Sequence, residues 1–372
     1  MTTVRRSGGH AVGKVVLAAV LLTTSAPDRL SAQDDARISE AQTVLSQLVE
    51  SYGVSGAEGP VREAVKGVLP PWARTETDTA GNLSVTVGSG APVVVFVAHL
   101  DEIGFTVTSV RADGSLELQT RGGFITSLFE ATPALVHTGR GDVPGVFIPR
   151  DTGLARHTPP PLRVDVGTTS REATLALGVG PGSTITMPKR YVRLAGTRAT
   201  GRSFDDRVGA TAQALALRHL DRAALRHRVV FVWSTREEIG LEGAQAVAAT
   251  LGTTPARVHA IDTFVSADSP LELPNFAVAP LGQGAVARAL DNSSVTPPAY
   301  VDSLAAVARA RKVRLQVGTT NGGNDGSVFT PYGVIDVAIG WPLRYSHSPA
   351  EVVDLRDVVS LADMIQAIAE LW

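Results

Sequence analysis

The chain has 372 residues, in which 34 Lys and Arg nearly balance 36 Asp and Glu. A formal charge of −2 gives no basic excess of the kind that nucleic-acid-binding proteins use, so we expect no nucleic-acid partner. With 44% hydrophobic and 19% charged residues the composition is globular, which excludes wholesale disorder. The absence of cysteine excludes disulfides, thiolate nucleophiles and cysteine-held metal sites, so any metal must be held by His, Asp and Glu.

The N-terminus has the order of segments that is typical of a secretory signal peptide. Arg5 and Arg6 precede an apolar run from Val15 to Leu22, and small residues follow up to Ala32. The run is about half of the roughly 20 residues that a membrane-spanning helix needs, so we expect no stable membrane span in the mature chain. We therefore expect residues 1–32 to be a signal peptide and the mature protein to be exported, either to the periplasm or out of the cell.

Apolar periodicity predicts strands alternating with helices in the front and the back of the chain. Val93 to Ala98 is a continuous Val-rich run, as in a strand buried on both faces, whereas Leu83 to Val87 alternates as a half-buried strand does. Helical spacing is seen over 36–50, 61–69, 207–225 and 355–371, and further buried strands are predicted at Val229 to Trp233, Val258 to Ile261 and Val334 to Ile339. This alternation indicates one α/β domain.

The middle of the chain has a different pattern. From about residue 107 to 195 Gly and Pro recur, short alternating segments predominate, and the one candidate helix is Ser170 to Ala176. We predict a β-rich domain over 107–195, inserted into an α/β domain made of 33–106 and 196–372.

Acidic and imidazole side chains follow the predicted buried strands. His99 and Asp101 come directly after Val93 to Ala98, and Glu237 and Glu238 follow Val229 to Trp233. Ligands bind at the carboxyl ends of strands in open α/β sheets. Two adjacent glutamates point to opposite faces on a regular strand, so both can serve one site only on an irregular loop.

Three more groups complete the set. Asp205 and Asp206 precede a predicted helix, Asp262 closes Val258 to Ile261, and His347 follows the last strand and a Trp341-Pro342 turn. Singly, each has a structural explanation such as a cap, a turn or a hydrogen bond. Together, imidazoles and carboxylates converging on one sheet edge suit two divalent ions bridged by one carboxylate.

The same residues lie in motifs that resemble the TET-type, or glutamyl (deblocking), dinuclear metalloaminopeptidase family. The resemblance covers essentially the whole predicted mature chain, and its motifs begin at Gly53, Ala98, Val164, Ser203, Glu237, Gly322 and Arg344. It implies a zinc-exopeptidase-like mixed sheet flanked by helices, with the inserted β-rich, small barrel-like domain serving subunit association. It also implies a homo-oligomer, from a dimer to a dodecamer.

The resemblance further implies a role for each site residue. His99, Asp205 and Asp262 would ligate one metal, and Asp205, Glu238 and His347 the other. Asp205 would bridge the two metals, and the peptide bond between Asp205 and Asp206 would be cis. Asp101 would orient His99, and Glu237 would be the general base that activates a metal-bridging water. The cofactors would be two divalent ions per subunit, Zn first, with Co and Mn also compatible with these ligands.

The expected activity is the removal of N-terminal residues from short peptides. One alternative is a metal-independent glycoside hydrolase of endoglucanase type, which uses two carboxylates and should survive a chelator. The chain has only four Trp and five Tyr, and this scarcity of aromatic residues argues against a cleft that stacks on sugars. Another alternative is a non-catalytic binding protein on a peptidase fold, which we would expect to have lost some of these ligands.

Overall fold

The computed structural model of the chain describes residues 32–150, 160–269 and 278–372. Apart from Ala32, with which the first helix begins, the predicted signal peptide lies outside the described residues. None of the helices in these three ranges has both the length and the apolar character needed to cross a membrane.

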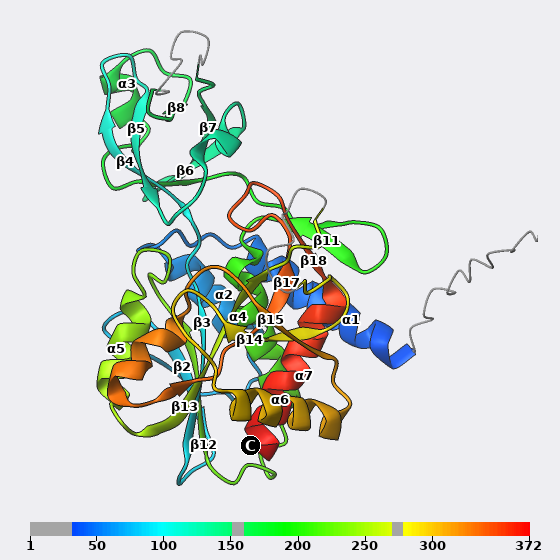
Figure 1. The fold of residues 1–372 in the computed structure, drawn as a ribbon. Helices are drawn as coiled ribbons and strands as arrows, with labels where there is room; N and C mark the ends of the chain where they lie inside the picture. The colour runs from blue at the N-terminus through cyan, green and yellow to red at the C-terminus, as the bar shows by residue number, and fades with distance from the viewer. Residues whose placement is uncertain (1–31, 151–159, 270–277) are drawn as a thin grey trace, which may run out of the picture.

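A mixed nine-stranded sheet forms the centre of the larger domain (Figure 1). Its strands are Thr75–Thr77 (β1), Leu83–Val87 (β2), Val93–His99 (β3), Arg228–Ser234 (β12), Pro255–Val265 (β13), Ala285–Leu290 (β14), Leu315–Thr319 (β15), Ile335–Asp336 (β16) and Ile339–Leu343 (β17). They lie in the order β1, β2, β12, β3, β13, β17, β14, β15, and β16 pairs with β13 beside this path. The central strands β12, β3, β13 and β17 run parallel, so their carboxyl ends meet at one edge.

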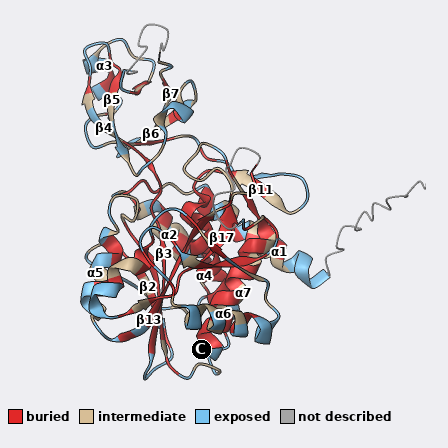
Figure 2. Ribbon diagram, viewed as in Figure 1, coloured by how far each residue is buried: buried red, intermediate tan, exposed pale blue. Residues whose placement is uncertain are grey.

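Helices cover both faces of this sheet (Figure 1). One face carries Ala32–Val49 (α1), Gly59–Val68 (α2), Phe204–His219 (α4), Pro298–Arg311 (α6) and Leu355–Leu371 (α7); the other carries Glu242–Leu251 (α5) and the 3-10 helix Asp325–Tyr332 (η2). Every residue of β3 is buried, with Phe96 packing on the α4 side and Val95 on the α5 side. Burial therefore follows the sheet and the inward faces of the helices, as Figure 2 shows, and the predicted α/β class is confirmed.

The middle of the chain forms a closed barrel that projects from the larger domain (Figure 1). Its strands are Gly104–Val110 (β4), Leu116–Arg121 (β5), Pro133–Thr138 (β6), Gly141–Phe147 (β7), Arg163–Asp165 (β8) and Thr184–Thr186 (β9), with the helices Thr126–Phe129 (η1) and Arg171–Ala176 (α3) between them. Phe105, Phe129 and Phe147 fill the barrel with mutual ring contacts. A small sheet of Val192–Arg193 (β10), Arg198–Gly201 (β11) and Glu351–Asp354 (β18) completes the fold. The barrel-like character predicted for the β-rich insertion is confirmed.

Three details of the predicted secondary structure were wrong. The single strand expected at Val334 to Ile339 is two strands, β16 and β17, and the expected Trp341-Pro342 turn lies inside β17. Proline is tolerated there because β17 pairs with β14 only as far as Gly340, so no ladder hydrogen bond is needed from Pro342 on that side. The helix expected to reach residue 225 ends at His219, since the Asp221 carboxylate accepts a hydrogen bond from the Ala223 N–H and forms a turn.

A buried ion cluster lies where the barrel joins the larger domain. The Glu102 carboxylate lies 2.7 Å from Lys189 Nζ and 3.3 Å from an Arg207 nitrogen, and all three side chains are fully buried. Glu102 precedes β4 and Lys189 follows β9, so one carboxylate ties together both chain segments that connect the barrel. Burial lowers the pKa of Lys189 to about 7, although the negative charge of Glu102 opposes this shift.

Replacing Glu102 with Gln should destabilise the protein strongly. The amide keeps the size of the carboxyl group but leaves buried cations without their counter-charge, which costs about 3–5 kcal/mol of unfolding free energy. Urea denaturation followed by circular dichroism measures this loss. Glu63→Gln is the control, because its exposed ion pair with Lys66 should contribute about 1 kcal/mol or less. Equal stabilities of the two variants would contradict the importance of the cluster.

Candidate metal centre

The predicted site residues from different strands meet at one edge of the sheet. His99 is the last residue of β3, and it is in register with Ser234, the last residue of β12. Glu237 and Glu238 follow Ser234 by a few residues, and Asp262 lies in the neighbouring strand β13. Parallel order of these strands therefore brings together side chains that are more than 160 residues apart in the sequence.

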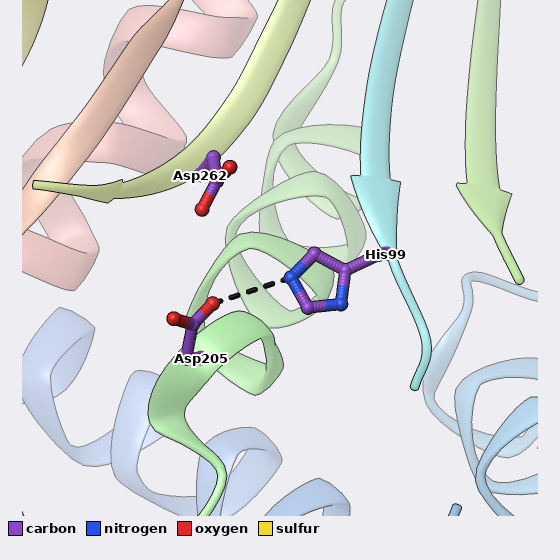
Figure 3. Close-up of side chains that lie close together, drawn as sticks. All are labelled: His99, Asp205 and Asp262. Atoms are coloured by element: carbon purple, nitrogen blue, oxygen red, sulfur yellow. Dashed lines mark hydrogen bonds and ion pairs between the residues drawn. The ribbon is translucent and has the colours of Figure 1, made fainter. Parts of the chain in front are cut away.

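Three of the predicted ligands form a compact group (Figure 3). One nitrogen of His99 and one oxygen each of Asp205 and Asp262 all lie within 4.8 Å of one another, and the three residues are buried. His99 Nε2 lies 3.2 Å from Asp205 Oδ1. This spacing is suitable for a single metal ion.

A second group forms on the other oxygen of Asp205. His347 Nε2 lies 3.4 Å from Asp205 Oδ2 and 3.3 Å from Glu238 Oε1. Asp205 thus presents one carboxylate oxygen to His99 and the other to His347. A carboxylate in this position can bridge two cations.

The Asp101 carboxylate holds the backbone of Glu237 and Glu238 in place. It accepts hydrogen bonds from the N–H groups of Glu237, at 3.0 Å, and Glu238, at 3.1 Å. It also accepts one from the Ser55 hydroxyl at 2.5 Å and lies 3.6 Å from His99 Nδ1. The chain after β12 is irregular, with positive φ angles at Arg236 and Leu241, so both adjacent glutamates line the same cavity. The requirement for an irregular loop, deduced from the sequence, is met.

Asp206 supports the backbone around the site. It accepts hydrogen bonds from the His99 N–H at 2.9 Å and from the Gly209 N–H at 2.7 Å. The peptide bond between Asp205 and Asp206 is cis. A Cβ atom at Gly209 would lie 2.2 Å from an Asp206 oxygen, so the close approach of this carboxylate to α4 requires glycine.

Burial and neighbouring charges shift the pKa values of several groups in the site. Burial alone would lower the pKa of His99 and of His347, but the surrounding carboxylates raise both well above the ordinary imidazole value. Burial raises the pKa of Glu237 well above its usual range, and it raises the pKa of Asp262 to about 6. Large pKa shifts of this kind, caused by burial and by specific charged neighbours, are typical of functional sites.

The donor set fits a pair of divalent ions. It consists only of imidazole nitrogens and carboxylate oxygens, which suit zinc, cobalt and manganese. Glu238 Oε1 is buried and accepts no hydrogen bond within the described residues, and its one charged neighbour there is His347 Nε2 at 3.3 Å, a second proposed ligand. A buried carboxylate oxygen without a hydrogen bond or a bound cation is costly.

One residue that the sequence did not reveal also contributes. Arg288, on β14, lies with Nη1 3.2 Å from Asp262 Oδ2 and donates to the Thr263 and Gly323 carbonyls at 3.0 Å. It also pairs with Asp291 at 3.0 Å. The sequence pattern predicts no strand at β14 and no motif includes Arg288, so the sequence gives no reason to place this arginine near the site.

The site opens into a cavity of about 550 Å³. Gly322 and Gly323 line this cavity, as do Leu241, Val265 and Asn321. The cavity is therefore large enough to admit the end of a peptide beside the proposed metal ligands.

Comparison with known proteins identifies the family. The model of the M42 glutamyl aminopeptidases matches residues 81–364. The chain is 30% identical to the lysyl aminopeptidase of Pyrococcus furiosus over an alignment of 342 residues, which covers 88% of this chain and 96% of that protein. The chain belongs to the M42 glutamyl aminopeptidase family. It is accordingly a peptidase of aminopeptidase type, and the family is metal-dependent.

Solved structures agree with this membership. The TET1 peptidase of Pyrococcus horikoshii, described as assembling into a tetrahedron or a large octahedral shell, superposes with a TM-score of 0.81 at 30% identity, covering 89% of this chain and all of that chain. A TET aminopeptidase from a marine sediment archaeon gives a TM-score of 0.84 at 25% identity, covering 90% and 96%. Both similarities extend over the barrel as well as the α/β domain.

Metal binding to this site should release protons. Raised pKa values keep His99 and His347 protonated at pH 7, and an imidazole must lose its proton to ligate a metal. We expect Zn²⁺ binding to metal-free protein to release about two protons and to weaken as the pH is lowered. Isothermal titration calorimetry in two buffers of different ionisation enthalpy measures the number of protons released per protein molecule.

The control is His137→Gln, which removes an acid-paired imidazole of the barrel, 2.8 Å from Asp142. This variant should release the same number of protons as wild type. Release of no protons by wild type would contradict protonated imidazoles at the site.

Proposed function

We propose that the protein is a dinuclear metal-dependent aminopeptidase that hydrolyses N-terminal residues from short peptides. The observation that carries this proposal is the position of Asp205, whose two oxygens face different histidines. His99, Asp205 and Asp262 would hold one ion, and Asp205, Glu238 and His347 the other. Zn²⁺ is the first candidate, and Co²⁺ or Mn²⁺ would suit the same donors.

Two bound ions would lower the pKa of a water molecule and polarise the scissile carbonyl. Glu237 then acts as the general base. It lines the cavity, its backbone N–H donates a hydrogen bond to Asp101, and burial raises the pKa of its carboxyl group above the usual range. A raised pKa makes a carboxylate a better acceptor for the proton of a water molecule. Glu237 takes a proton from the attacking water and returns it to the leaving amine.

The site favours this chemistry over the two alternatives. A glycoside hydrolase needs two carboxylates across a sugar and no imidazoles, whereas here two histidines face one aspartate. A non-catalytic protein would not be expected to keep every ligand and the base together. The family to which the chain belongs is also a peptidase family.

The variant Glu237→Gln tests the proposed base. Because Gln cannot accept the proton, turnover of a peptide substrate should fall about 10²- to 10⁴-fold. Metal content should stay at the wild-type level, since Glu237 is not among the proposed ligands. Steady-state kinetics and elemental analysis of the same preparation measure both quantities.

Glu242→Gln is the matched control. Glu242 follows in the same part of the chain but is half-exposed and paired with Arg236 at 2.7 Å. Its replacement should leave turnover within a few-fold of wild type. Full metal content with nearly unchanged turnover in Glu237→Gln would refute the role of Glu237.

The cavity wall further suggests a preference for neutral N-terminal residues. Apart from the proposed ligands, the base and Arg288, the lining residues that the structure describes carry no charge. Both terminal nitrogens of Arg288 are already bonded to Asp262, Asp291 and two carbonyls, and its Nε is buried, so the side chain is not available to pair with an acidic substrate. A charged substrate side chain would lose hydration without gaining a partner.

A panel of aminoacyl p-nitroanilides tests this preference. We expect kcat/KM for Leu and Ala substrates to exceed those for Glu and Lys substrates by about tenfold or more. The assay is run on metal-free protein with Zn, Co or Mn added back. Fastest cleavage of the Glu or Lys substrate would refute the preference, and no cleavage with any metal would refute the aminopeptidase itself.

Assembly and export complete the proposal. We propose a homo-oligomer in which the barrel mediates association, which the assemblies described for the Pyrococcus horikoshii relative support. Exposed Ile125, Leu128 and Val146 give the barrel an apolar surface that is consistent with such contacts. Export is proposed on the sequence of residues 1–32 alone.

A further inference from the structure

The barrel reaches into the metal centre through one loop. We call residues Gly122–Ile125, between β5 and η1, the barrel loop. The carbonyl oxygen of Gly123 lies 2.7 Å from His347 Nδ1. His347 is 224 residues further along the chain and belongs to the other domain, so this contact depends on the placement of the barrel.

The Gly123 contact determines which nitrogen His347 presents to the site. A carbonyl oxygen can only accept, so Nδ1 must carry the donated proton. Nε2, which faces Asp205 and Glu238, is then the nitrogen available for a metal ion. A hydrogen bond of this kind orients a metal-binding imidazole and increases its basicity.

His347 depends on this contact more than the other proposed ligands do. Its side chain is 32% exposed, whereas those of Asp205 and Glu238 are 5% exposed. Packing alone therefore does not fix the ring. Apart from its contacts with the acidic groups of the site, its ring is held by the Gly123 carbonyl.

The same loop also limits the position of Glu238. Gly122 has a φ of +94°, and a Cβ atom there would lie 3.1 Å from Glu238 Oε2 and 2.5 Å from the Ile103 side chain. The absence of a side chain at Gly122 leaves room for the Glu238 carboxylate. The loop thus lies against Glu238 and His347, which are the two proposed ligands that only the second ion has.

The barrel core holds the loop in place. Phe124, the next residue, makes ring contacts at 5.1 Å with Phe105 and with Phe129, both of which are buried in the barrel. The barrel is in turn tied to the larger domain by the Glu102 ion cluster. A continuous set of contacts therefore runs from the interior of the barrel to His347.

We propose that the barrel loop is a positioning element for the half of the metal centre formed by Glu238 and His347, with the Gly123 carbonyl orienting the imidazole and Gly122 admitting the carboxylate. The proposal rests on the proposed function, because it takes Glu238 and His347 to be metal ligands. It gives the barrel a role at the active site in addition to any role in association.

The variant Gly122→Ala tests the proposal. A methyl group there should displace Glu238 and the loop, so that the second ion binds about tenfold or more weakly while the first ion, at His99, Asp205 and Asp262, keeps its affinity. Zinc titration of metal-free protein by calorimetry resolves the two sites, and elemental analysis after dialysis gives the stoichiometry. A general loss of structure would not weaken one site selectively.

Gly182→Ala is the matched control. Gly182 is also a barrel glycine, with a φ of +89°, but nothing lies within 4 Å of the position of its Cβ atom. It imposes similar backbone strain without contact with a ligand, and both sites should keep wild-type affinity. Equal weakening of the second site by both variants would overturn the proposal.

Phe124→Leu decides the matter if Gly122→Ala fails to fold. Loss of the aromatic contacts should loosen the loop and weaken the second site selectively, without touching a ligand. Wild-type affinity at both sites in this variant, or in a folded Gly122→Ala, would overturn the loop proposal alone. Binding of a single ion by the wild-type protein would instead refute the dinuclear assignment, and the loop proposal with it.

Discussion

The buried carboxylate of Asp101 is the group on which the geometry of the centre depends. Burial would raise its pKa, but the neighbouring His99 and the hydrogen bonds from Ser55 and the Glu237 backbone lower the pKa below the ordinary value, so it stays charged. A buried charge of this kind needs several donors, and two of them are the N–H groups of Glu237 and Glu238. These two hydrogen bonds hold the chain after β12 in an irregular loop. In that loop both glutamates line one cavity.

The next residue connects this geometry to the barrel. Glu102 points away from the metal centre, into the cluster with Lys189 and Arg207, and it also accepts a hydrogen bond from the Gly53 N–H. Asp101 and Glu102, two consecutive acids just after β3, therefore have different roles, one within the site and one at the junction of the domains. Because both are fully buried, neither the site nor the junction can shift without disturbing the other.

The sequence was sufficient for the features that depend on local pattern. A continuous Val-rich run predicted β3, and the order of strands and helices predicted that His99, Glu238 and Asp262 would converge. The roles of these residues came from the resemblance and not from spacing. Arg288, the division of β16 from β17 and the contact between Gly123 and His347 could not be predicted, because each depends on which distant segments become neighbours in the folded chain. Every residue has a backbone carbonyl, so the amino-acid sequence does not indicate which carbonyl accepts a hydrogen bond from a histidine.

The two halves of the centre are supported differently. His99 and Asp262 belong to central strands, and Asp205 lies at the start of a buried helix, so this half is held by the same packing that stabilises the fold. Glu238 and His347 lie on loops, and their positions depend on Asp101 and on the barrel loop. A site on regular elements is held more rigidly than one on loops. The half built on the sheet is thus fixed once the α/β domain has folded, whereas the loop-borne half also requires the barrel to be in place. If Glu238 and His347 hold a metal ion as proposed, the inserted domain is a structural condition for a complete metal centre.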